Sequence, residues 1–418
     1  MRIALLSYRS KPHVGGQGIY VQRLSRALVA LGHTVEVFSG QPYPELDEGV
    51  LLTEVPSLDL YRPGEEFRNP AVREFRDLID VEEWLRMRSG AFPEPLTFSR
   101  RVMRLLADRV DDFDVVLDNQ TLATPLLGVE RLGLPLVAII HHPITMDRAI
   151  ELASARSWKR RFGVWRWYSF LRQQLRTAPR LRRVIVPSES SKRDVIREFG
   201  VDPARVTTVL LGVDDDLFVP PATPRVPGRL LAMASADAPL KGVNVLLEAF
   251  AKLLTERELE LVLVTKPKEG GRTERLLDRL GIADRVTFAH GLTDEELVAL
   301  MGSAELACVP SLYEGFSLPT AELMACATPL VVSRAGAIPE VVGPDGLCAD
   351  LVEPGDVDGL VEAIGALLDD PDRRARMGAA GRARVTESFS WRAVGERTAV
   401  VLAETVRSYQ EESTRADR

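Results

Sequence analysis

The sequence has little cysteine or histidine, the residues that most often hold metals or form cross-links. Its 418 residues include three cysteines and five histidines, and no cluster of them has the spacing of a metal site or a redox motif. Cys308, Cys326 and Cys348 each lie in a hydrophobic stretch. This pattern excludes a disulfide framework, and we expect buried free thiols in a reducing cytoplasm.

Long apolar runs are also lacking. No stretch approaches the roughly 20 apolar residues that a helix needs to span a bilayer. The chain begins with a short strand-like run and shows no signal-peptide pattern. The sequence therefore predicts a cytoplasmic protein, and it contains no short repeat or low-complexity tract.

Positive charge is in deficit. The net charge of −7 argues against general nucleic-acid binding. One segment departs from this balance, because residues 156–183 hold ten Lys and Arg, no Asp or Glu, and three of the five tryptophans. Phe162, Trp165 and Ser169 share a helical face there, and arginine with tryptophan suits an anionic membrane interface. We expect either peripheral contact with the inner face of a membrane or a helix whose aromatic side chains pack in the core.

What the sequence does contain, nearly throughout, is an alternation of strand-like and helical patterns. Strands are predicted at residues 2–7, 35–38, 115–117, 136–140, 184–186, 230–233, 259–265, 286–288, 306–310 and 330–333. Helical spacing lies between them, for example at residues 19–31 and 243–254. This alternation predicts parallel sheets with crossover helices, and 418 residues exceed the size of one core. We expect an α/β fold of two Rossmann-like, doubly wound domains with a cleft between them.

The domain boundary is expected in a stretch rich in proline and aspartate at residues 212–224. We assign residues 1–212 to an N-terminal domain and residues 213–394 to a C-terminal domain. The last helical stretch, residues 395–418, is expected to pack back on the N-terminal domain. Residues 40–112 are the least regular part of the chain.

The loop G-G-Q-G at residues 15–18 precedes a helix, and a helix N-terminus favours phosphate. One hypothesis is a dinucleotide site in which Glu36, after the second strand, holds a ribose. The fingerprint is poor, because the third small residue is missing and the loop from strand to glycine is long. The alternatives are a glycine turn without a ligand, and a loop in which Gly16 faces a ligand in the cleft.

Two Asp-x-Asp runs, at residues 112–114 and 214–216, have the spacing that holds a divalent metal against a diphosphate. One lies at a helix-to-strand turn and the other in the linker, and both are places where aspartates are commonly solvated. We therefore interpret these aspartates as solvated surface residues and expect no metal site.

Four polar residues follow predicted strands, where parallel sheets face their ligands. His141 and His142 follow one strand, and we expect at least one of them in the site. Lys241 begins the helix after another strand, and Lys266 follows a third. A lysine beside a helix N-terminus is a natural partner for a diphosphate.

Residues 313–322, Y-E-G-F-S-L-P-T-A-E, place two carboxylates eight residues apart. Gly315 and Pro319 put a helix start between them, since proline is best tolerated in the first turn of a helix. Glu314 is then on a loop, and Glu322 lies just inside a helix whose free N–H groups favour an anion.

Together with L-K-G-V-N-V-L-L-E-A at residues 240–249 and the first 40 residues, this stretch resembles the retaining nucleotide-sugar glycosyltransferases of glycosyltransferase family 4, which have the GT-B fold. The resemblance covers almost the whole chain. It implies transfer of a sugar from a nucleoside diphosphate sugar, UDP- or GDP-linked, to a hydroxyl acceptor. That acceptor would be a glycan, a lipid-linked molecule or a small molecule. It also implies retention of configuration, and neither metal nor other cofactor.

The resemblance assigns roles to the matched carboxylates and to a histidine. Glu314 would bind hydroxyls of the donor sugar, and Glu322 would bind the ribose of the nucleotide. His141 corresponds to a histidine near the donor sugar, with His142 as the second choice.

The resemblance also implies how the diphosphate is held. Lys241 would neutralise it, and Gly16 would let the N-terminal domain approach it. Backbone N–H groups would be supplied around Phe316, Ser317 and Leu318. Family members usually carry an arginine shortly before the Lys-Gly pair, whereas residues 233–242, M-A-S-A-D-A-P-L-K-G, contain none. We expect Lys266 to supply the second cation.

Three other functions fit the same scaffold. They are a nucleotide-sugar epimerase, a phosphorylase with a lysine-bound pyridoxal cofactor, and a non-catalytic protein that binds sugar nucleotides. For a transferase, the acceptor is expected to bind mainly within residues 40–180.

Overall fold

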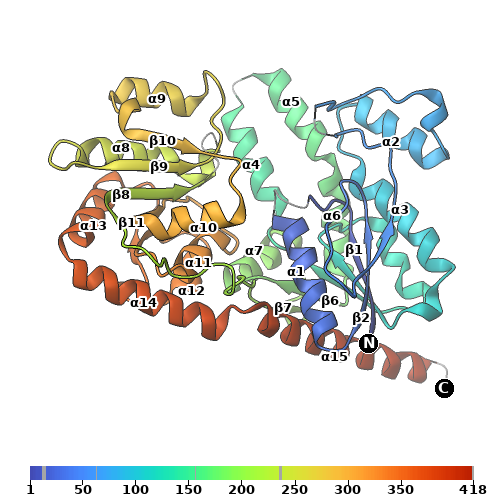
Figure 1. The fold of residues 1–418 in the computed structure, drawn as a ribbon. Helices are drawn as coiled ribbons and strands as arrows, with labels where there is room; N and C mark the ends of the chain where they lie inside the picture. Colours follow the sequence, from blue (N-terminus) through green and yellow to red (C-terminus); the bar gives the residue numbers. More distant parts are fainter. Residues whose placement is uncertain (12–15, 63, 156, 235–237, 417–418) are drawn as a thin grey trace. The chain divides into compact units, whose positions relative to one another are not determined.

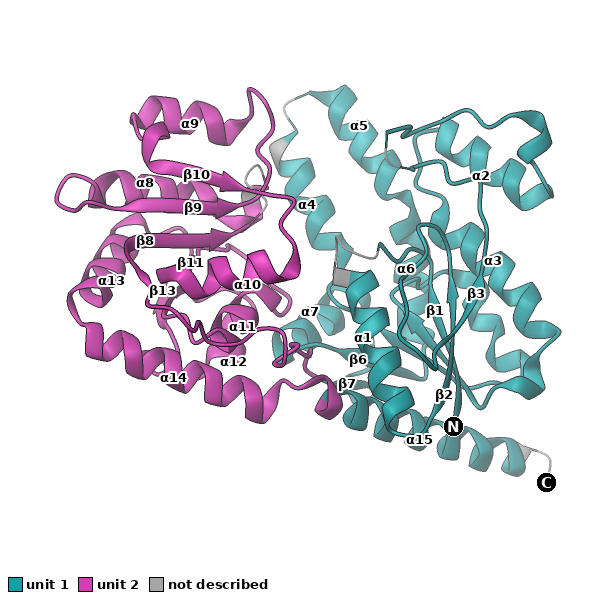
Figure 2. Cartoon of the chain, in the orientation of Figure 1, with its two compact units in different colours: residues 1–209, 394–418 teal, residues 210–393 magenta. Residues whose placement is uncertain are grey.

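The structure is a computed structural model, and it describes residues 1–11, 16–62, 64–155, 157–234 and 238–416. The chain divides into two compact units (Figure 2). Unit 1 comprises Met1–Val209 together with Val394–Arg418, and unit 2 comprises Leu210–Ala393. Among the described residues, no helix has both the length and the apolar composition needed to cross a membrane.

Unit 1 contains a seven-stranded sheet in the order β3-β2-β1-β4-β5-β6-β7, and every neighbouring pair is parallel (Figure 1). Its strands are β1 (Arg2–Ser7), β2 (Thr34–Ser39), β3 (Leu51–Glu54), β4 (Val115–Asn119), β5 (Leu136–Ile139), β6 (Arg183–Val186) and β7 (Val206–Thr208). Strands β4 and β5 are buried along their whole length. Burial on both faces explains why the central strands read as continuous apolar runs.

The helices of unit 1 follow the strands as crossover connections. They are α1 (Gly16–Ala30), α2 (Leu78–Arg88), α3 (Glu94–Ala107), α4 (Ile144–Ser154), α5 (Trp158–Trp167), α6 (Leu171–Thr177) and α7 (Glu189–Phe199). Helix α1 packs on β1 and β2, and α7 packs on β6 and β7. Side chains such as Phe38, Leu106 and Leu122 belong to a core cluster that includes residues of α3 and α7.

Unit 2 contains a six-stranded parallel sheet in the order β10-β9-β8-β11-β12-β13. Its strands are β8 (Val226–Met233), β9 (Glu260–Val264), β10 (Val286–Ala289), β11 (Ala304–Val309), β12 (Leu330–Ser333) and β13 (Asp350–Val352). Its helices are α8 (Val243–Leu253), α9 (Arg272–Leu280), α10 (Asp294–Ser303), α11 (Leu318–Ala325), α12 (Ile338–Val342), α13 (Val357–Asp369) and α14 (Pro371–Ser388). The predicted fold class, two doubly wound units with parallel sheets, is confirmed.

The last helix, α15 (Trp391–Ala416), belongs to unit 1 from Val394 onward. Tyr409 Oη donates to the carbonyl of Glu130 at 2.7 Å. Arg182 pairs with Glu130 at 3.0 Å and with Glu412 at 2.7 Å. These contacts tie the end of the chain to the turn that precedes β5.

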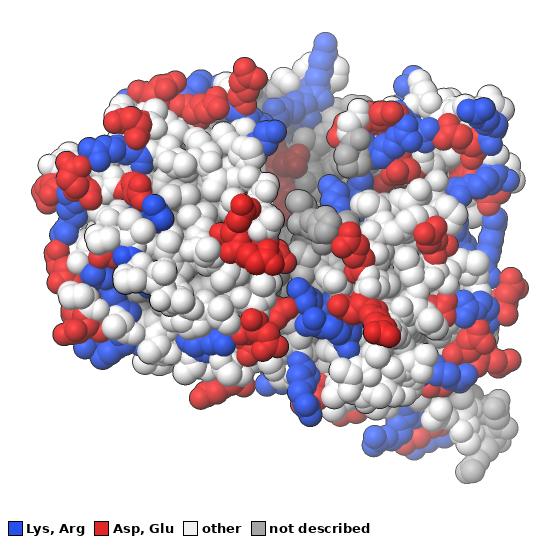
Figure 3. All heavy atoms as spheres, viewed as in Figure 1, with Lys and Arg blue, Asp and Glu red and all other residues white. Residues whose placement is uncertain are grey.

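Charged side chains of both signs are interspersed over each unit on the face drawn in Figure 3. This face therefore has no extended area of one sign. The three cysteines are unbonded and buried.

Candidate active site

The strand order places a ligand crevice at the same point of each sheet. In both sheets the first strand is central, with the second strand on one side and the fourth on the other, so the direction of winding reverses between β1 and β4 and between β8 and β11. Ligands of doubly wound folds bind at the carboxyl ends of the strands beside such a reversal. Most of the predicted site residues follow strands at these two places.

In unit 2, the loop after β11 brings Glu314 to Lys241. Lys241 Nζ lies 2.7 Å from Glu314 Oε1, and Ser311 Oγ donates to the same oxygen at 2.7 Å. The Glu314 side chain is 11% exposed and that of Lys241 is 33% exposed. Lys241 ends a short 3₁₀ turn after β8 (Pro239–Lys241). The two side chains therefore meet at the carboxyl edge of β8 and β11, as a largely desolvated ion pair.

Two glycines allow the loops around this pair to pack closely. A Cβ on Gly336 would lie 2.1 Å from the Glu314 carbonyl oxygen, and the N–H of Ala337 donates to that oxygen at 2.9 Å. A Cβ on Gly242 would lie 1.9 Å from the carbonyl oxygen of Pro310. Both glycines have positive φ, which is costly for any other residue. The sequence prediction missed Gly336, although G-A-I-P-E-V-V follows a predicted strand.

Helix α11 begins at Leu318, with Pro319 in its first turn as predicted. Ser317 caps it in a left-handed conformation, φ 81° and ψ 71°, and its hydroxyl bonds that of Thr320 at 2.8 Å. Phe316 is buried with its ring 5.8 Å from that of Phe389. The N–H groups of Phe316, Ser317 and Leu318 have no acceptor among the described residues. This helix end thus offers the backbone donors that were predicted.

Glu322 lies on α11, one turn beyond Leu318. Burial, with a smaller contribution from Asp294, raises the pKa of Glu322 to about 7. A carboxyl with this pKa is partly protonated at neutral pH, so it can donate as well as accept a hydrogen bond.

Lys266 is exposed in the loop after β9 and has no ion-pair partner within the described part of the chain. Because β9 is the neighbour of β8, Lys266 lies at the same sheet edge as Lys241. Ser235, Ala236 and Asp237, in the run without the expected arginine, lie outside the described residues.

In unit 1, Gly16 is the first residue of α1, and Gly15 lies outside the described residues. Glu36, the expected ribose ligand, already has a partner of opposite charge. It forms a bidentate pair with Arg109, at 2.7 and 2.8 Å, which holds the pKa of Glu36 below its ordinary value. The dinucleotide hypothesis therefore lacks its acidic residue.

His141 directly follows the end of β5 and Ile140. The ring Nε2 of His141 lies 2.8 Å from Asn119 Oδ1, and the ring is edge-on to that of Tyr20 with centroids 4.7 Å apart. The backbone N–H of His141 donates to Gln120 Oε1 at 2.7 Å. Because Oδ1 can only accept, Nε2 carries the proton and Nδ1 keeps its lone pair. Burial lowers the pKa of His141 to about 3, so the ring is neutral at neutral pH.

His142, the second choice, is held differently. Its Nε2 lies 2.9 Å from Asp147 Oδ2, and its carbonyl accepts from Gln120 Nε2 at 2.8 Å. The sequence prediction missed Asn119 and Gln120, which orient the two histidines. Their position after a predicted strand, in V-V-L-D-N-Q, was the available signal.

The Asp-x-Asp runs have structural partners. Asp112 pairs with Arg109 at 2.7 Å and Asp114 with Arg2 at 2.8 Å, whereas Asp214 accepts from the N–H of Leu217 at 3.3 Å. Within the part of the chain that the structure describes, no three His, Cys, Asp or Glu residues are grouped as metal ligands.

Two family models match the chain. The model described as "Glycosyltransferase Family 4" matches residues 14–217, and the model described as "Glycosyl transferases group 1" matches residues 222–384.

Among curated proteins, the chain is 55% identical over 407 residues to the MMP alpha-(1->4)-mannosyltransferase of Mycolicibacterium hassiacum. This match covers 97% of the chain and 98% of the relative. The chain is also 29% identical over 439 residues to D-inositol 3-phosphate glycosyltransferase 2 of Catenulispora acidiphila, covering 97% and 95% of the two chains.

Solved structures share the fold. Sucrose-phosphate synthase of Thermosynechococcus elongatus has a TM-score of 0.73 at 22% identity, and the match covers 97% of this chain and 99% of that one. HepE of Anabaena, solved in complex with UDP-glucose, has a TM-score of 0.67 at 17% identity, covering 98% and 100%. With its family 4 domain followed by a group 1 domain, the chain belongs to the glycosyltransferases of the GT-B fold and is an enzyme of that class.

Proposed function

We propose that the protein is a retaining, metal-independent α-(1→4)-mannosyltransferase that uses a nucleoside diphosphate mannose, UDP- or GDP-linked. The sugar and linkage are those in the name of the relative that is 55% identical over nearly the full length of both chains. The observation that carries the proposal is the Lys241–Glu314 pair beside the N-terminus of α11. It combines a cation for a diphosphate with a carboxylate for sugar hydroxyls.

In the proposed reaction, the bond between the anomeric carbon and the diphosphate oxygen breaks, and its electron pair leaves with the diphosphate. Negative charge then grows next to the Lys241 ammonium and the N–H groups at the start of α11. Fixed donors that face developing charge usually make the largest single contribution to lowering a barrier. The N–H groups at the start of α11 are fixed by the backbone, whereas Lys241 is proposed to exchange part of its contact with Glu314 for the diphosphate.

Retention follows if the acceptor attacks the face that the diphosphate leaves. The acceptor oxygen forms the new bond to the anomeric carbon, and its proton passes to an oxygen of the departing diphosphate. For an α-(1→4) product, the attacking group is a 4-hydroxyl. The departing diphosphate thus takes both the electron pair of the broken bond and the proton of the acceptor, and no covalent enzyme intermediate is required.

Glu314 is proposed to hold hydroxyls of the donor sugar and so fix its orientation, which lowers the entropic cost of reaching the transition state. Glu322 is proposed to hold the ribose. A partly protonated carboxyl can both accept a hydrogen bond from a ribose hydroxyl and donate one to it. His141 is proposed to contact the donor sugar. Its neutral ring and the fixed proton at Nε2 suit hydrogen bonding rather than charge stabilisation.

Lys266 is proposed as the second cation for the diphosphate. Its support is its exposure at the carboxyl edge of β9 and its lack of a carboxylate partner among the described residues. Gly16 is proposed to admit the diphosphate at the start of α1.

The test is a panel of UDP- and GDP-linked mannose and glucose with a mannoside acceptor, in buffer containing EDTA. We expect release of nucleoside diphosphate with one mannose donor, and a new α-linked anomeric proton in the NMR spectrum of the product. A β-linked product would refute retention, and activity restored only by added metal would refute metal independence. Donor isomerisation without an acceptor would indicate the epimerase, and saturable binding without turnover a binding protein.

We also propose that α5 contacts an anionic membrane surface. Trp158, Phe162 and Trp165 are 74%, 59% and 43% exposed, and their spacing places them on one helix face. Three basic residues lie between Trp158 and Phe162 in the sequence of α5, namely Lys159, Arg160 and Arg161. Trp167, Tyr168 and Phe170 instead pack into unit 1, and Arg156 lies outside the described residues. Within residues 156–183, the aromatic side chains from Trp167 to Phe170 are thus packed in the interior, whereas those from Trp158 to Trp165 are exposed and suit a bilayer interface.

Flotation with vesicles that contain phosphatidylglycerol tests this contact. We expect the wild-type protein to float, and the W158S/F162S variant to lose most of this binding. V72S/V400S is the control, because Val72 and Val400 are also exposed apolar residues. Absence of salt-sensitive flotation of the wild-type protein would refute the contact.

A further inference from the structure

Unit 1 contains a cavity of about 950 Å³ that is separate from the candidate active site. Its walls come from the end of α2 and the loop after it, from α3, α5 and α6, and from the 3₁₀ turns at Thr124–Gly128, Glu130–Leu132, Tyr168–Phe170 and Ala178–Arg180. Among the described residues that line it are eight arginines and one carboxylate, Glu130. A strongly cationic hollow in a protein of net charge −7 calls for an explanation.

The cavity lies toward the opposite end of β5 from His141. Leu136, the first residue of β5, lines the cavity, whereas His141 follows the last residue of that strand. Five residues of extended chain separate the two by about 16 Å. A ligand of the cavity would therefore not occupy the position of the donor sugar.

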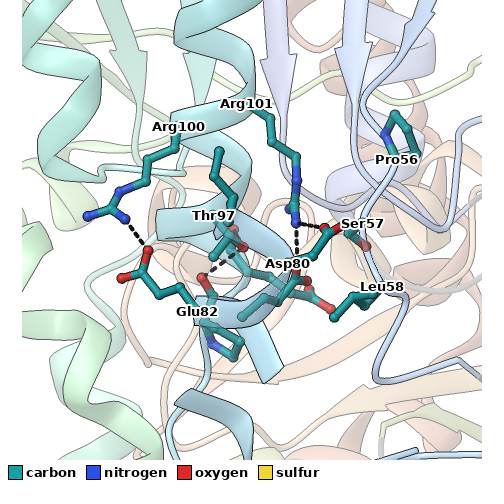
Figure 4. Close-up of polar contacts among 12 residues, drawn as sticks. Pro56, Ser57, Leu58, Asp80, Glu82, Thr97, Arg100 and Arg101 are labelled. Atoms are coloured by element: carbon teal, nitrogen blue, oxygen red, sulfur yellow. Dashed lines mark hydrogen bonds and ion pairs between the residues drawn. The ribbon is translucent and has the colours of Figure 1, made fainter. Parts of the chain in front are cut away.

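Half of these arginines are already engaged. Glu82 accepts from both Arg86, at 2.8 Å, and Arg100, whose side chain Figure 4 shows pointing at this carboxylate. Arg182 pairs with Glu130 and Glu412. Arg166 donates to the carbonyl of Ser89 at 3.0 Å and to its hydroxyl at 2.5 Å.

The other four have no carboxylate partner within the described part of the chain. They are Arg131, Arg172, Arg176 and Arg180. Arg172 lies over the ring of Trp165 at 4.5 Å, a contact that leaves its charge uncompensated. Arg131, Arg176 and Arg180 are exposed to solvent. Cations that face one hollow repel one another, and a bound anion would remove this repulsion.

The remaining lining suits a bound molecule rather than bulk water. Buried apolar side chains, among them Leu96, Leu136, Phe170 and Leu181, form part of the wall. Apolar walls exclude water and strengthen the attraction between a guanidinium group and an anion. The volume lies within the range of small-molecule sites, about 300–1,000 Å³.

We propose that this cavity binds an anion that carries two or more phosphate groups. The planar guanidinium fork matches the oxygens of phosphate in a bidentate manner, and four unpaired arginines match roughly the charge of two phosphates. Two sources supply such chemistry, a soluble polyphosphorylated molecule and the phosphodiester headgroups of a lipid surface. This proposal is independent of the proposed mannosyl transfer.

Titration calorimetry with inorganic tripolyphosphate tests the proposal on the full chain. We expect saturable binding that weakens with salt, and a loss of about tenfold or more in affinity in R176A/R180A. R131Q, on a different turn, provides a second variant with the same expected direction. R376A/R407A is the control, because it removes two exposed arginines outside the cavity, and we expect it to bind like the wild type.

Tripolyphosphate can also bind the donor site, so Lys241→Ala is titrated in parallel. Binding that persists in Lys241→Ala and weakens in R176A/R180A supports the cavity. Binding lost in Lys241→Ala and unchanged in R176A/R180A overturns it, as does equal weakening in the control pair.

Vesicles of phosphatidylglycerol form the second arm. Flotation that is weakened in R176A/R180A, without binding of tripolyphosphate, supports the proposal with a lipid headgroup as the source. Binding of tripolyphosphate supports it with a soluble ligand. Failure of both probes to bind the wild-type protein overturns it.

Discussion

Lys241 Nζ and Glu314 Oε1 lie 2.7 Å apart, although 73 positions separate the two residues in the chain. Their charges compensate each other at the edge of the sheet where the donor diphosphate is proposed to bind. Removing either residue therefore leaves the other as a partly buried, unpaired charge.

Replacing Lys241 by alanine is expected to lower kcat/KM by roughly 10²–10³-fold, the effect typical of removing one fixed donor from developing charge. Steady-state release of nucleoside diphosphate measures it. In a double-mutant cycle with Glu314→Gln, we expect a coupling of about 0.5–3 kcal/mol, because the two side chains are in contact. Strict additivity would contradict a functional pair, and Arg376→Ala serves as the neutral control.

Lys266→Ala tests the second cation. If Lys266 supports the diphosphate, the variant should bind the donor about tenfold more weakly, with a smaller dependence of affinity on salt. Lys252→Ala, an exposed lysine paired with Asp358 on the same unit, should leave donor affinity unchanged. The idea fails if Lys266→Ala binds the donor normally while Lys241→Ala does not.

Glu322 should make stability depend on pH. Its pKa in the folded protein is about 7, above the ordinary value of 4.5, so folding disfavours the ionised form. Between these two values the native state binds more protons than the unfolded state, and stability should fall as pH rises through this window. Glu322→Gln should lose this component of the pH dependence in urea unfolding at pH 5 and pH 8. Glu295→Gln, an exposed residue of α10, should retain it.

Asn119→Asp should raise the pKa of His141. The new carboxylate would lie where Asn119 Oδ1 now accepts from Nε2, and a negative charge there favours the imidazolium. NMR titration of the ring protons measures the shift. Asn119→Ala should instead leave the pKa of His141 low. Because the His141 ring would lose the contact that fixes its orientation, we expect a lower kcat in this variant. An unchanged pKa of His141 in Asn119→Asp would contradict the contact between the two side chains, and an unchanged kcat in Asn119→Ala would show that Asn119 does not position the ring.

Gly336→Ala should destabilise unit 2 by more than the cost of its backbone conformation alone. The added Cβ would meet the Glu314 carbonyl oxygen at 2.1 Å, at φ +55°. Gly281→Ala isolates the conformational cost, about 1–2 kcal/mol, because Gly281 has φ +67° and open space around it. Thermal unfolding should therefore rank wild type above Gly281→Ala and Gly281→Ala above Gly336→Ala. Similar losses in both variants would mean that the loops can separate without cost.

The central strands could be predicted from the sequence because burial on both faces makes them continuous apolar runs. The edge strands β3, β7 and β13 were not predicted, since L-L-T-E is mostly exposed and V-T-T and D-L-V have only three residues each. Helices α14 and α15 are separated by a break at Phe389 and Ser390, which was not predicted. Helical spacing continues across that break and gives no sign of it.

For the candidate site, the sequence identified Lys241 and Glu314 but assigned them to different parts of the donor. Their direct contact depends on how the loops after β8 and β11 pack, which the spacing within either loop does not reveal. The orienting role of Asn119 was missed for the same reason, because it arises from the register of β4 against β5. Five of the eight cavity arginines come from the basic segment at residues 156–183, which the sequence did single out. The other three, Arg86, Arg100 and Arg131, lie far from it in the chain, so the sequence does not indicate that all eight face one cavity.

Because Val394–Arg418 belongs to unit 1, unit 2 is an insertion within the chain of unit 1. The two ends of the insertion are joined, since Val213 bridges to Ser390 and Gly212 lies against the ring of Trp391. During synthesis, the ribosome must therefore complete all of unit 2 before unit 1 receives its last helix. The unit translated first is the last to be finished.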